Sequence, residues 1–346
     1  MTRTTRLGAG SAVALLLSAT LHPSPAAAAD EPLACGAVIT HNATLTADIG
    51  PCSAGGLIVS GDNVILNLAG FVIKGNSDAA NDGVGILVSN DPTGSGSNVT
   101  GVTVKNGRVT DFDAGVVLDG GSGHVVKNLL VKDNVGDGSG DFGDGIAVSS
   151  SNGNTIRDND VIRNGLFDGI GLFGPSSDNF IVNNVVGENN VQFVGEDGIR
   201  IEGPGAKNNT VRGNTVSGST LDGIAIFSDQ VTGNLNTGNK IINNLVVANG
   251  FGILGARPGE GITTFLRAND NTIRGNTVRD NAGSGILIGS GSLNNTIRSN
   301  VATGNGRRAS AARPRFDLHD LNVDCDNNVW RANLAGTAFP SCTTGG

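Results

Sequence analysis

A short unit that begins with Gly-Ile or Gly-Val recurs along the chain and restricts the fold more than any other feature. Its copies stand roughly 24 to 33 residues apart, a period that indicates a stack of repeated structural units. They begin at Gly85, Gly115, Gly145, Gly169, Gly198, Gly223, Gly252 and Gly285. A second unit, Asn-Thr-Ile/Val-Arg-x-Asn, follows several of them and starts at Asn154, Asn209, Asn271 and Asn295.

Each repeat contains three short apolar segments separated by turn residues. Within a segment, apolar and polar residues alternate with the period of a β-strand, and no segment shows an amphipathic helical stripe. Strands this short are not stable alone, so equivalent strands of successive repeats are expected to stack on one another. The stacking predicts three parallel sheets wound into a solenoid, with about 4.8 Å between coils.

The stacking places equivalent side chains in columns. β-Branched residues pack well on their own copies, and asparagine amides can bond to the amides above and below them. We expect two apolar columns, Ile146, Ile170, Ile199, Ile224, Ile253 and Ile286, and Ile156, Ile181, Val211, Ile241, Ile273 and Ile297. A polar column is predicted at Asn159, Asn184, Asn214, Asn244, Asn276 and Asn300, with Asn106 and Asn128 as its earlier members.

The chain ends differ from the repeats. Residues 1–29 read as a signal peptide, with Arg3 and Arg6 before a short apolar core and a cut near Ala29, so a secreted protein is expected. No later stretch is apolar for long enough to cross a membrane. We expect an N-terminal cap with the first coils in 30–80, the repeat domain in 81–305 and a C-terminal cap in 306–346.

The cysteines stand in two pairs at opposite ends of the chain. Three pairings of the 4 cysteines are conceivable. We favour disulfides Cys35–Cys52 and Cys325–Cys342, because each closes a short local loop in an exported protein. Each contributes roughly 3 kcal/mol by restricting the unfolded chain.

The charge balance restricts the partners. Removal of residues 1–29 takes away two of the 23 basic residues and none of the 31 acidic ones, which leaves a net charge of 21 − 31 = −10. An acidic protein of this kind suits neither nucleic acid nor an anionic membrane surface.

The Gly-Ile-x-Val and Asn-Asn-Thr-Ile-x-Gly-Asn units resemble the right-handed parallel β-helix repeat proteins of the pectin-lyase-like superfold, over roughly residues 60–305. Segments 35–75 and 317–342 resemble the caps of exported actinobacterial members, most of which have no assigned activity. The resemblance implies an all-β, single-stranded right-handed parallel β-helix, a three-sheet solenoid with disulfide-bonded N- and C-terminal caps. Members of known role mostly act on polysaccharides as lyases, hydrolases or epimerases.

The chain departs from the motifs of those enzymes. The polygalacturonase signatures are not intact, and the absence of tyrosine excludes lyases that use it. Copper-delivery relatives need soft or imidazole ligands. This chain has 1 methionine and 4 scattered histidines, which argues against a copper-delivery role.

An acidic row is the best candidate for chemistry. Asp144, Asp168, Asp197 and Asp222 each precede the glycine of a Gly-Ile strand, so stacking brings them about 4.8 Å apart, and a cation, a proton or an arginine must offset their repulsion. Glu196, Arg200 and Glu202 lie on the same coil as Asp197, with Arg200 expected to point outward. We assign catalytic roles to Asp168, Glu196, Asp197, Arg200 and Asp222, and substrate binding to Glu202. Aspartates that cap turns are the alternative.

Three further sets of residues are candidates. A basic row at Arg157, Arg212, Arg274 and Arg298 is expected to face water on the sheet next to that of the acidic row, interrupted by Val182 and Ile242. Arg157 and Arg212 are assigned to substrate binding, and a solvated face is the alternative. Asp137, Asp141 and Asp144 lie in a glycine-rich loop that suits calcium, although the loop is not an EF-hand. Asp317, His319, Asp320, Asp324 and Asp326 form either a general-base site or a hydrogen-bonded cap. The segment 255–270 is the longest excursion from the minimal coil.

These observations predict a monomeric extracellular protein whose partner is a polysaccharide, with calcium as its one candidate cofactor. The first hypothesis is a lyase, hydrolase or epimerase that acts on a glycan, for example one that contains uronic acid. The alternative is a non-catalytic carbohydrate-binding or cell-surface structural β-helix protein, which the missing catalytic motifs and scarce aromatic residues favour.

Overall fold

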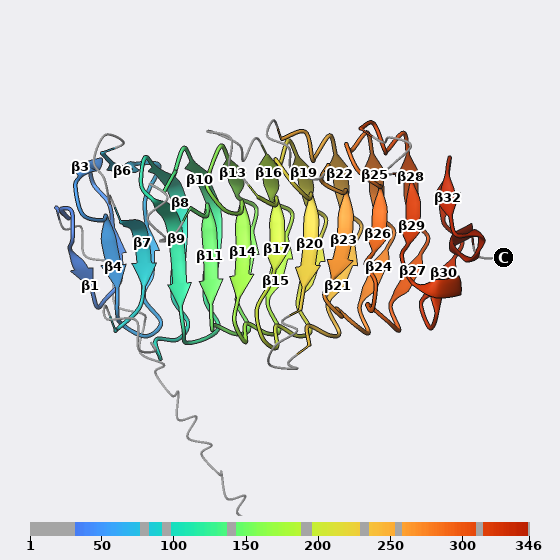
Figure 1. Cartoon of the computed structure of the whole chain (residues 1–346). Coiled ribbons are helices and arrows are strands. Elements are labelled where there is room, and N and C mark those ends of the chain that lie inside the picture. The colour runs from blue at the N-terminus through green and yellow to red at the C-terminus, as the bar shows by residue number, and fades with distance from the viewer. Residues whose placement is uncertain are drawn as a thin grey trace, which may run out of the picture.

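The computed structural model forms one elongated stack of coils that runs from the N-terminal to the C-terminal end (Figure 1). Strands β1 to β32 and two short 3-10 helices, η1 (Val323–Cys325) and η2 (Ser341–Thr344), make up its regular elements. None of the helices in these segments has the length and apolar character that crossing a membrane requires. The structure describes residues 32–76, 83–91, 98–136, 143–187, 196–228, 235–252, 258–308 and 314–344.

One strand of every coil belongs to a 12-stranded parallel sheet, which forms one wall of the helix. Its strands follow one another in chain order, as a solenoid requires. They are β1 (Val38–Ile39), β4 (Leu57–Val59), β7 (Val84–Val88), β9 (Ala114–Asp119), β11 (Ile146–Ser149), β14 (Ile170–Phe173), β17 (Ile199–Ile201), β20 (Ile224–Phe227), β23 (Ile262–Phe265), β26 (Ile286–Ile288), β29 (Leu318–Asp320) and β32 (Ala338–Phe339).

The other strands form two further parallel stacks, joined where β8 (Thr103–Thr110) and β10 (Val125–Lys132) run through both. The first lateral stack also contains β2 (Ala43–Thr44), β5 (Ile65–Asn67), β12 (Thr155–Arg157), β15 (Phe180–Val182), β18 (Thr210–Arg212), β21 (Lys240–Ile242), β24 (Thr272–Arg274), β27 (Thr296–Arg298) and β30 (Val329–Arg331). The second contains β3 (Ile49–Cys52), β6 (Val72–Gly75), β13 (Asp160–Ile162), β16 (Val185–Gly187), β19 (Thr215–Ser217), β22 (Leu245–Val247), β25 (Thr277–Arg279), β28 (Val301–Thr303) and β31 (Leu334–Ala335). The three stacks confirm the predicted right-handed parallel β-helix.

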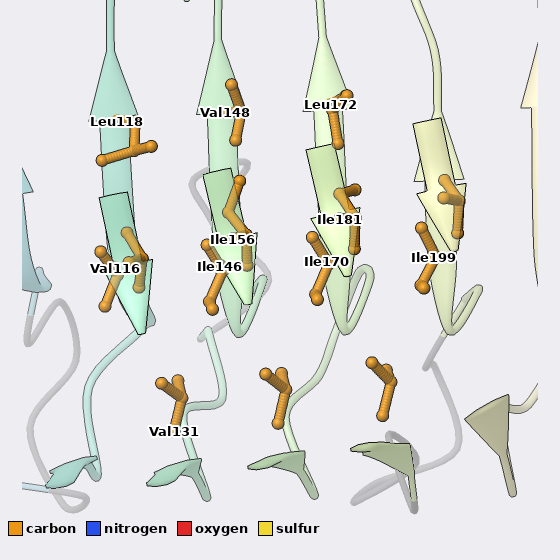
Figure 2. Packing of buried hydrophobic residues seen from close by; sticks show 14 of the residues in the cluster. Val116, Leu118, Val131, Ile146, Val148, Ile156, Ile170, Leu172, Ile181 and Ile199 are labelled. Atoms are coloured by element: carbon orange, nitrogen blue, oxygen red, sulfur yellow. The ribbon is translucent and has the colours of Figure 1, made fainter. Parts of the chain in front are cut away.

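The core lies inside the coil, where equivalent aliphatic residues stack on one another. Ile146 pairs with Ile170 and Ile170 with Ile199, and all three side chains are fully buried. Figure 2 shows these residues in line beside a second column that contains Ile156 and Ile181. Burial of each such side chain contributes about 1.5–3 kcal/mol, so the columns supply the main driving force for stacking.

One member of the predicted columns is wrong. The residue that pairs with Ile224 is Ile262, on β23, rather than Ile253. Ile253 itself lies outside the described residues. Glu260-Gly261-Ile262 repeats the acidic-Gly-Ile pattern of the preceding coils, so this coil starts later than the Gly-Ile pair at Gly252 suggests. Part of the predicted excursion 255–270 is therefore regular strand.

The predicted asparagine column is present and buried. Asn184 donates its backbone N–H and its Nδ2 to Oδ1 of Asn214, at 2.8 and 3.0 Å, and Asn214 donates in the same way to Asn244. The earlier members of this column were predicted wrongly. Leu129 fills the inward position, while Asn106 and Asn128 lie one residue earlier and form a separate amide contact of 3.2 Å.

The sequence analysis did not identify two further ladders of the same kind. One runs from Asn154 through Asn179 to Asn328, and another includes Asn249, Asn281 and Asn305. Both end on a carboxylate. Asn305 donates to Oδ1 of Asp317, and Nδ2 of Asn328 donates to Oδ2 of Asp320.

Both predicted disulfides are present, Cys35–Cys52 and Cys325–Cys342, and both lie near the ends of the stack. In both segments for which caps were predicted, strands still pair in parallel with strands of the neighbouring coil. At the C-terminal end, Trp330 takes the place of an isoleucine in the inward column by pairing with Ile297. Strand β32 then adds the last member of the 12-stranded sheet.

Candidate functional site

The candidate site lies on the outer face of the 12-stranded sheet, around Arg200. Arg200 is the central residue of β17, between Ile199 and Ile201, which point into the core. Strand alternation therefore directs the Arg200 side chain outward, as predicted. Its partners on the two neighbouring strands are Gly171 and Ala225, whose small size leaves room for the guanidinium to lie over the sheet.

Arg200 gathers the acidic residues of its own coil. Its Nη1 contacts Oε2 of Glu196, and its Nε lies 2.8 Å from Oε2 of Glu202 and 3.9 Å from Oδ2 of Asp197. The Arg200 side chain is 15% exposed, whereas those of Glu196 and Glu202 are 33% and 39% exposed. One arginine thus holds three carboxylates, two of which remain accessible to solvent.

The predicted acidic row is a column at the turn that precedes the 12-stranded sheet. Each carboxylate accepts the backbone N–H of its counterpart on the next coil, at 3.0 Å from Asp144 to Asp168, 2.9 Å from Asp168 to Asp197 and 2.8 Å from Asp197 to Asp222. Glu260 continues the column, since its N–H donates to Oδ1 of Asp222 and its own carboxylate accepts from Ser284. The predicted alternative, aspartates that cap turns, is thus what the geometry shows for these oxygens.

Burial changes the protonation of the first two members. It raises the pKa of Asp144 to about 7, with hydrogen bonding from Asp168 and the charge of Arg200 acting in the opposite direction. Burial and then the charge of Asp144 raise the pKa of Asp168 well above its ordinary value, again against the charge of Arg200. Oδ2 of Asp168 has no hydrogen-bond partner among the described residues. The sequence analysis expected a cation, a proton or an arginine to offset the repulsion within this row. A proton and Arg200 do so here.

Phenylalanines form a row on the same face, which the sequence analysis missed. Phe173, Phe227 and Phe265 end β14, β20 and β23, and each is partly exposed. The rings of Phe227 and Phe265 are 5.3 Å apart, and Arg200 lies over Phe227 with Cζ 4.7 Å from the ring centroid. The signal was a phenylalanine four residues after the glycine in three of the repeats.

The predicted substrate-binding arginines lie elsewhere. Arg157 and Arg212 end strands of the first lateral stack and are separated in their column by Val182. The structure therefore does not bring them to the Arg200 cluster, because their strands belong to a different wall of the coil. Of the proposed calcium ligands, Asp137 and Asp141 lie outside the described residues, and Asp144 belongs to the acidic column.

Two of the predicted acidic residues near the C-terminus, Asp317 and Asp320, accept hydrogen bonds that close this end, whereas Asp324 and Asp326 are exposed. Oδ2 of Asp317 accepts bonds from the backbone N–H groups of Gly336 and Thr337, and Oδ2 of Asp320 accepts from the indole of Trp330 at 2.9 Å. His319 lies on β29 with Nδ1 3.3 Å from the Ser284 hydroxyl. Burial, followed by the charge of Arg315, lowers the pKa of His319 to about 4.

Solved structures with the same fold include two tailspikes and an epimerase. The Dettilon tailspike protein (gp208) is 17% identical, with 86% of this chain and 53% of that chain covered and a TM-score of 0.54. A tailspike mutant of E. coli bacteriophage HK620, solved with a hexasaccharide, is 14% identical, with coverages of 88% and 57% and a TM-score of 0.55. The periplasmic alginate epimerase AlgG is 12% identical, with coverages of 87% and 73% and a TM-score of 0.50.

The chain spans about half the length of these tailspikes, and at such identities the likeness establishes the fold alone. No protein of curated function matches the sequence. Residues 60–263 match the family described as periplasmic copper-binding protein (NosD). Because this match covers more than half of the chain, the protein belongs to the NosD family.

Proposed function

We propose that the protein is exported and acts on an extracellular polysaccharide along the outer face of the 12-stranded sheet. The observation that carries the proposal is the row of Phe173, Phe227 and Phe265 beside the charged groups around Arg200. Aromatic faces pack against sugar rings, while carboxylates and guanidinium groups orient hydroxyls. The two disulfides favour a compartment outside the cytoplasm.

The charge of this face favours an uncharged glycan. Glu196 and Glu202 already occupy the guanidinium of Arg200, and Asp197 lies nearby. A uronate carboxylate at this position would compete with them and be repelled. We therefore place a neutral sugar chain here, in place of the uronic-acid glycan that the sequence suggests.

Groups for proton transfer lie beside this face, in the buried acidic column. A carboxyl group whose pKa is about 7, as for Asp144, is present in both its protonated and its ionised form at neutral pH and lies in the range that suits a general acid or base. Arg200 and the protonated Asp144–Asp168 pair are the groups that a lyase, hydrolase or epimerase would use, and we assign the reaction to this broad class.

Non-catalytic binding of the same glycan is the second candidate. It is favoured by the hydrogen bonds of the acidic column, because turn capping alone accounts for the burial of Asp168, Asp197 and Asp222. In that case the phenylalanine row binds sugar and the column only holds the coils together.

Copper, which the family description implies, does not fit the described residues. They contain no group of three histidine, cysteine or acidic side chains that is arranged to hold a metal ion. All four cysteines are in disulfides. His124 is buried within the stack and His319 lies against Ser284. Copper prefers imidazole, thiolate or thioether ligands, and no such set gathers in this part of the chain.

Calcium at Asp137, Asp141 and Asp144 stays a proposal. Hard oxygen ligands suit this ion, and its binding to the folded state raises the melting temperature. A melting temperature that does not change between added calcium and a chelator would contradict it.

The experiment is a panel of neutral and anionic polysaccharides, assayed for binding and for reducing, unsaturated or epimerised products. A Phe227→Ala/Phe265→Ala variant is expected to lose binding of the neutral polysaccharides, and Phe180→Ala is the matched control for this binding, since Phe180 is exposed on another wall. Products that disappear in Asp168→Asn identify an enzyme. Binding without products supports the second candidate, and equal binding by all variants would contradict the site.

A further inference from the structure

The outer face of the first lateral stack carries a second charged surface. Its three-residue strands bury the central residue and direct the first and third outward. The parallel register aligns these outward positions in two columns from β5 to β30. The basic residues in the columns, here called the basic face, are Lys105, Lys127, Arg157, Arg212, Lys240, Arg274, Arg298 and Arg331.

The two columns contain no aspartate or glutamate. Their other outward members are Ile65, Asn67, Thr103, Val125, Thr155, Phe180, Val182, Thr210, Ile242, Thr272, Thr296 and Val329. This segregation occurs in a chain of net charge −8. A solvated surface that only prevents aggregation would serve as well with charges of both signs, as exposed faces normally carry.

One column of the face has a run of three basic residues on successive coils toward each end. In the N-terminal run, Lys105, Lys127 and Arg157, the arginine pairs with Asp158. Arg274, Arg298 and Arg331 occupy one column on successive coils, so their strands lie about 4.8 Å apart. None of the three forms a salt bridge with a described carboxylate, whereas Arg279 and Arg307 share Asp280 nearby. Like charges directly opposite one another on neighbouring strands repel. An anion laid across them relieves that repulsion.

We propose that the basic face binds a linear, carboxylated polysaccharide that lies along the helix axis. Guanidinium groups bind carboxylates in a bidentate manner, and a column of them suits a polymer with repeated carboxylates better than a single small anion. Thr272 and Thr296 flank the arginines and offer hydroxyls to the sugar. The disulfides favour an oxidising compartment outside the cytoplasm, where the anionic polymer that the protein meets is a glycan rather than nucleic acid.

This site is separate from the phenylalanine row. The two lie on different walls of the coil, one neutralised and acidic, the other basic. The basic face would hold the protein on an anionic matrix while the other face remains free, so neither proposal depends on the other.

The test uses polygalacturonate as the probe, with dextran as the neutral control, in calorimetric titrations at 50 and 200 mM NaCl. We expect binding to polygalacturonate alone, weaker at the higher salt concentration because the contacts are ionic and exposed. An Arg274→Gln/Arg298→Gln/Arg331→Gln variant should bind at least about tenfold more weakly.

The matched control removes the same charge from paired arginines, as Arg163→Gln/Arg279→Gln/Arg307→Gln. It should keep most of the affinity, and thermal unfolding of both variants verifies that they fold. Equal losses in the two variants, binding that does not respond to salt, or unchanged affinity in the first variant would overturn the proposal. Tighter binding to duplex DNA than to polygalacturonate at the same salt would overturn the choice of ligand.

Discussion

The carboxylate of Asp144 accepts a hydrogen bond of 3.0 Å from the backbone N–H of Asp168 on the adjacent coil. The bond links two buried acids whose pKa values both lie above the ordinary value, so the acidic column holds protons that an exposed row would release near pH 4. Stability and any proton transfer on this face consequently depend on pH in the neutral range.

Alkaline pH should destabilise the folded chain through Asp144. The pKa of this carboxyl rises from 3.8 when unfolded to about 7 when folded, so its stabilisation is full below pH 4 and disappears as the pH rises through 7. We expect the melting temperature to fall by several degrees between pH 5 and 8, at about 2–4 °C for each kcal/mol. Asp144→Asn should reduce this fall, and an equal fall in wild type and variant would argue against the raised pKa.

Loss of Arg200 should raise the pKa of Asp144 further. The positive charge of Arg200 lowers the pKa of both Asp144 and Asp168 against the larger effect of burial. In Arg200→Gln the carboxyl resonance of Asp144, followed by 13C NMR, should titrate above pH 7. Arg163→Gln removes an arginine that pairs with Asp133 on a different stack and should leave the titration in place. A midpoint that moves downward in Arg200→Gln would contradict the arrangement.

Replacement of one ladder asparagine should be costly. Asn214 receives two bonds from Asn184 and donates to Asn244 and to the carbonyl of Ile181, all of them buried. Asn214→Ala leaves these buried partners without their hydrogen bonds and is expected to lower the free energy of unfolding by about 2–4 kcal/mol. Asn327→Ala, at an exposed turn, should change it by less than about 0.5 kcal/mol in the same denaturant titration. Equal effects would show that the amide ladder adds little.

His319 should remain neutral through the physiological range. Burial and then the charge of Arg315 lower its pKa from 6.5 to about 4. The associated stability is present above pH 6.5 and is lost as the pH falls through 4. Histidine ring resonances in NMR should show a midpoint near 4 for His319 in the folded protein and near 6.5 in denaturant. A folded-state midpoint at 6 or above would contradict the burial described for this strand.

The sequence predicted the coil well because the period of the repeat directly reports which residues stack. Ile146, Ile170 and Ile199 align as expected, since a buried column tolerates few residue types. The prediction failed where two Gly-Ile pairs compete, as at Ile253 and Ile262, because local pattern does not show which pair continues the register. It also misplaced Asn128, whose neighbour Leu129 is the better residue for the inward position.

The candidate site was harder to predict from the sequence. The sequence gathered Glu196, Asp197, Arg200 and Glu202 correctly because they share a coil, and these residues are in contact. It also placed Arg157 and Arg212 on a sheet next to that of the acidic row, where the structure has them, but it did not show which charged residues near them form ion pairs. The phenylalanine row escaped notice because its members are few in number and only their alignment on one face makes them a surface.

The asparagine ladders give the stack a direction and a definite end. An asparagine within a ladder, such as Asn214, donates its backbone N–H and one Nδ2 hydrogen to the next amide on the C-terminal side, and its other Nδ2 hydrogen to a carbonyl of the preceding coil. A carboxylate, whose side chain has no N–H to donate, ends two of the three series at Asp317 and Asp320. All joints in between are chemically alike. A whole coil could thus be added or removed within a ladder without leaving an N–H group unpaired. A chain that ended before Asp317 would lose the carboxylate that accepts the last N–H groups. Protein length in such a stack is adjustable in steps of one turn, provided that the final acceptors are kept.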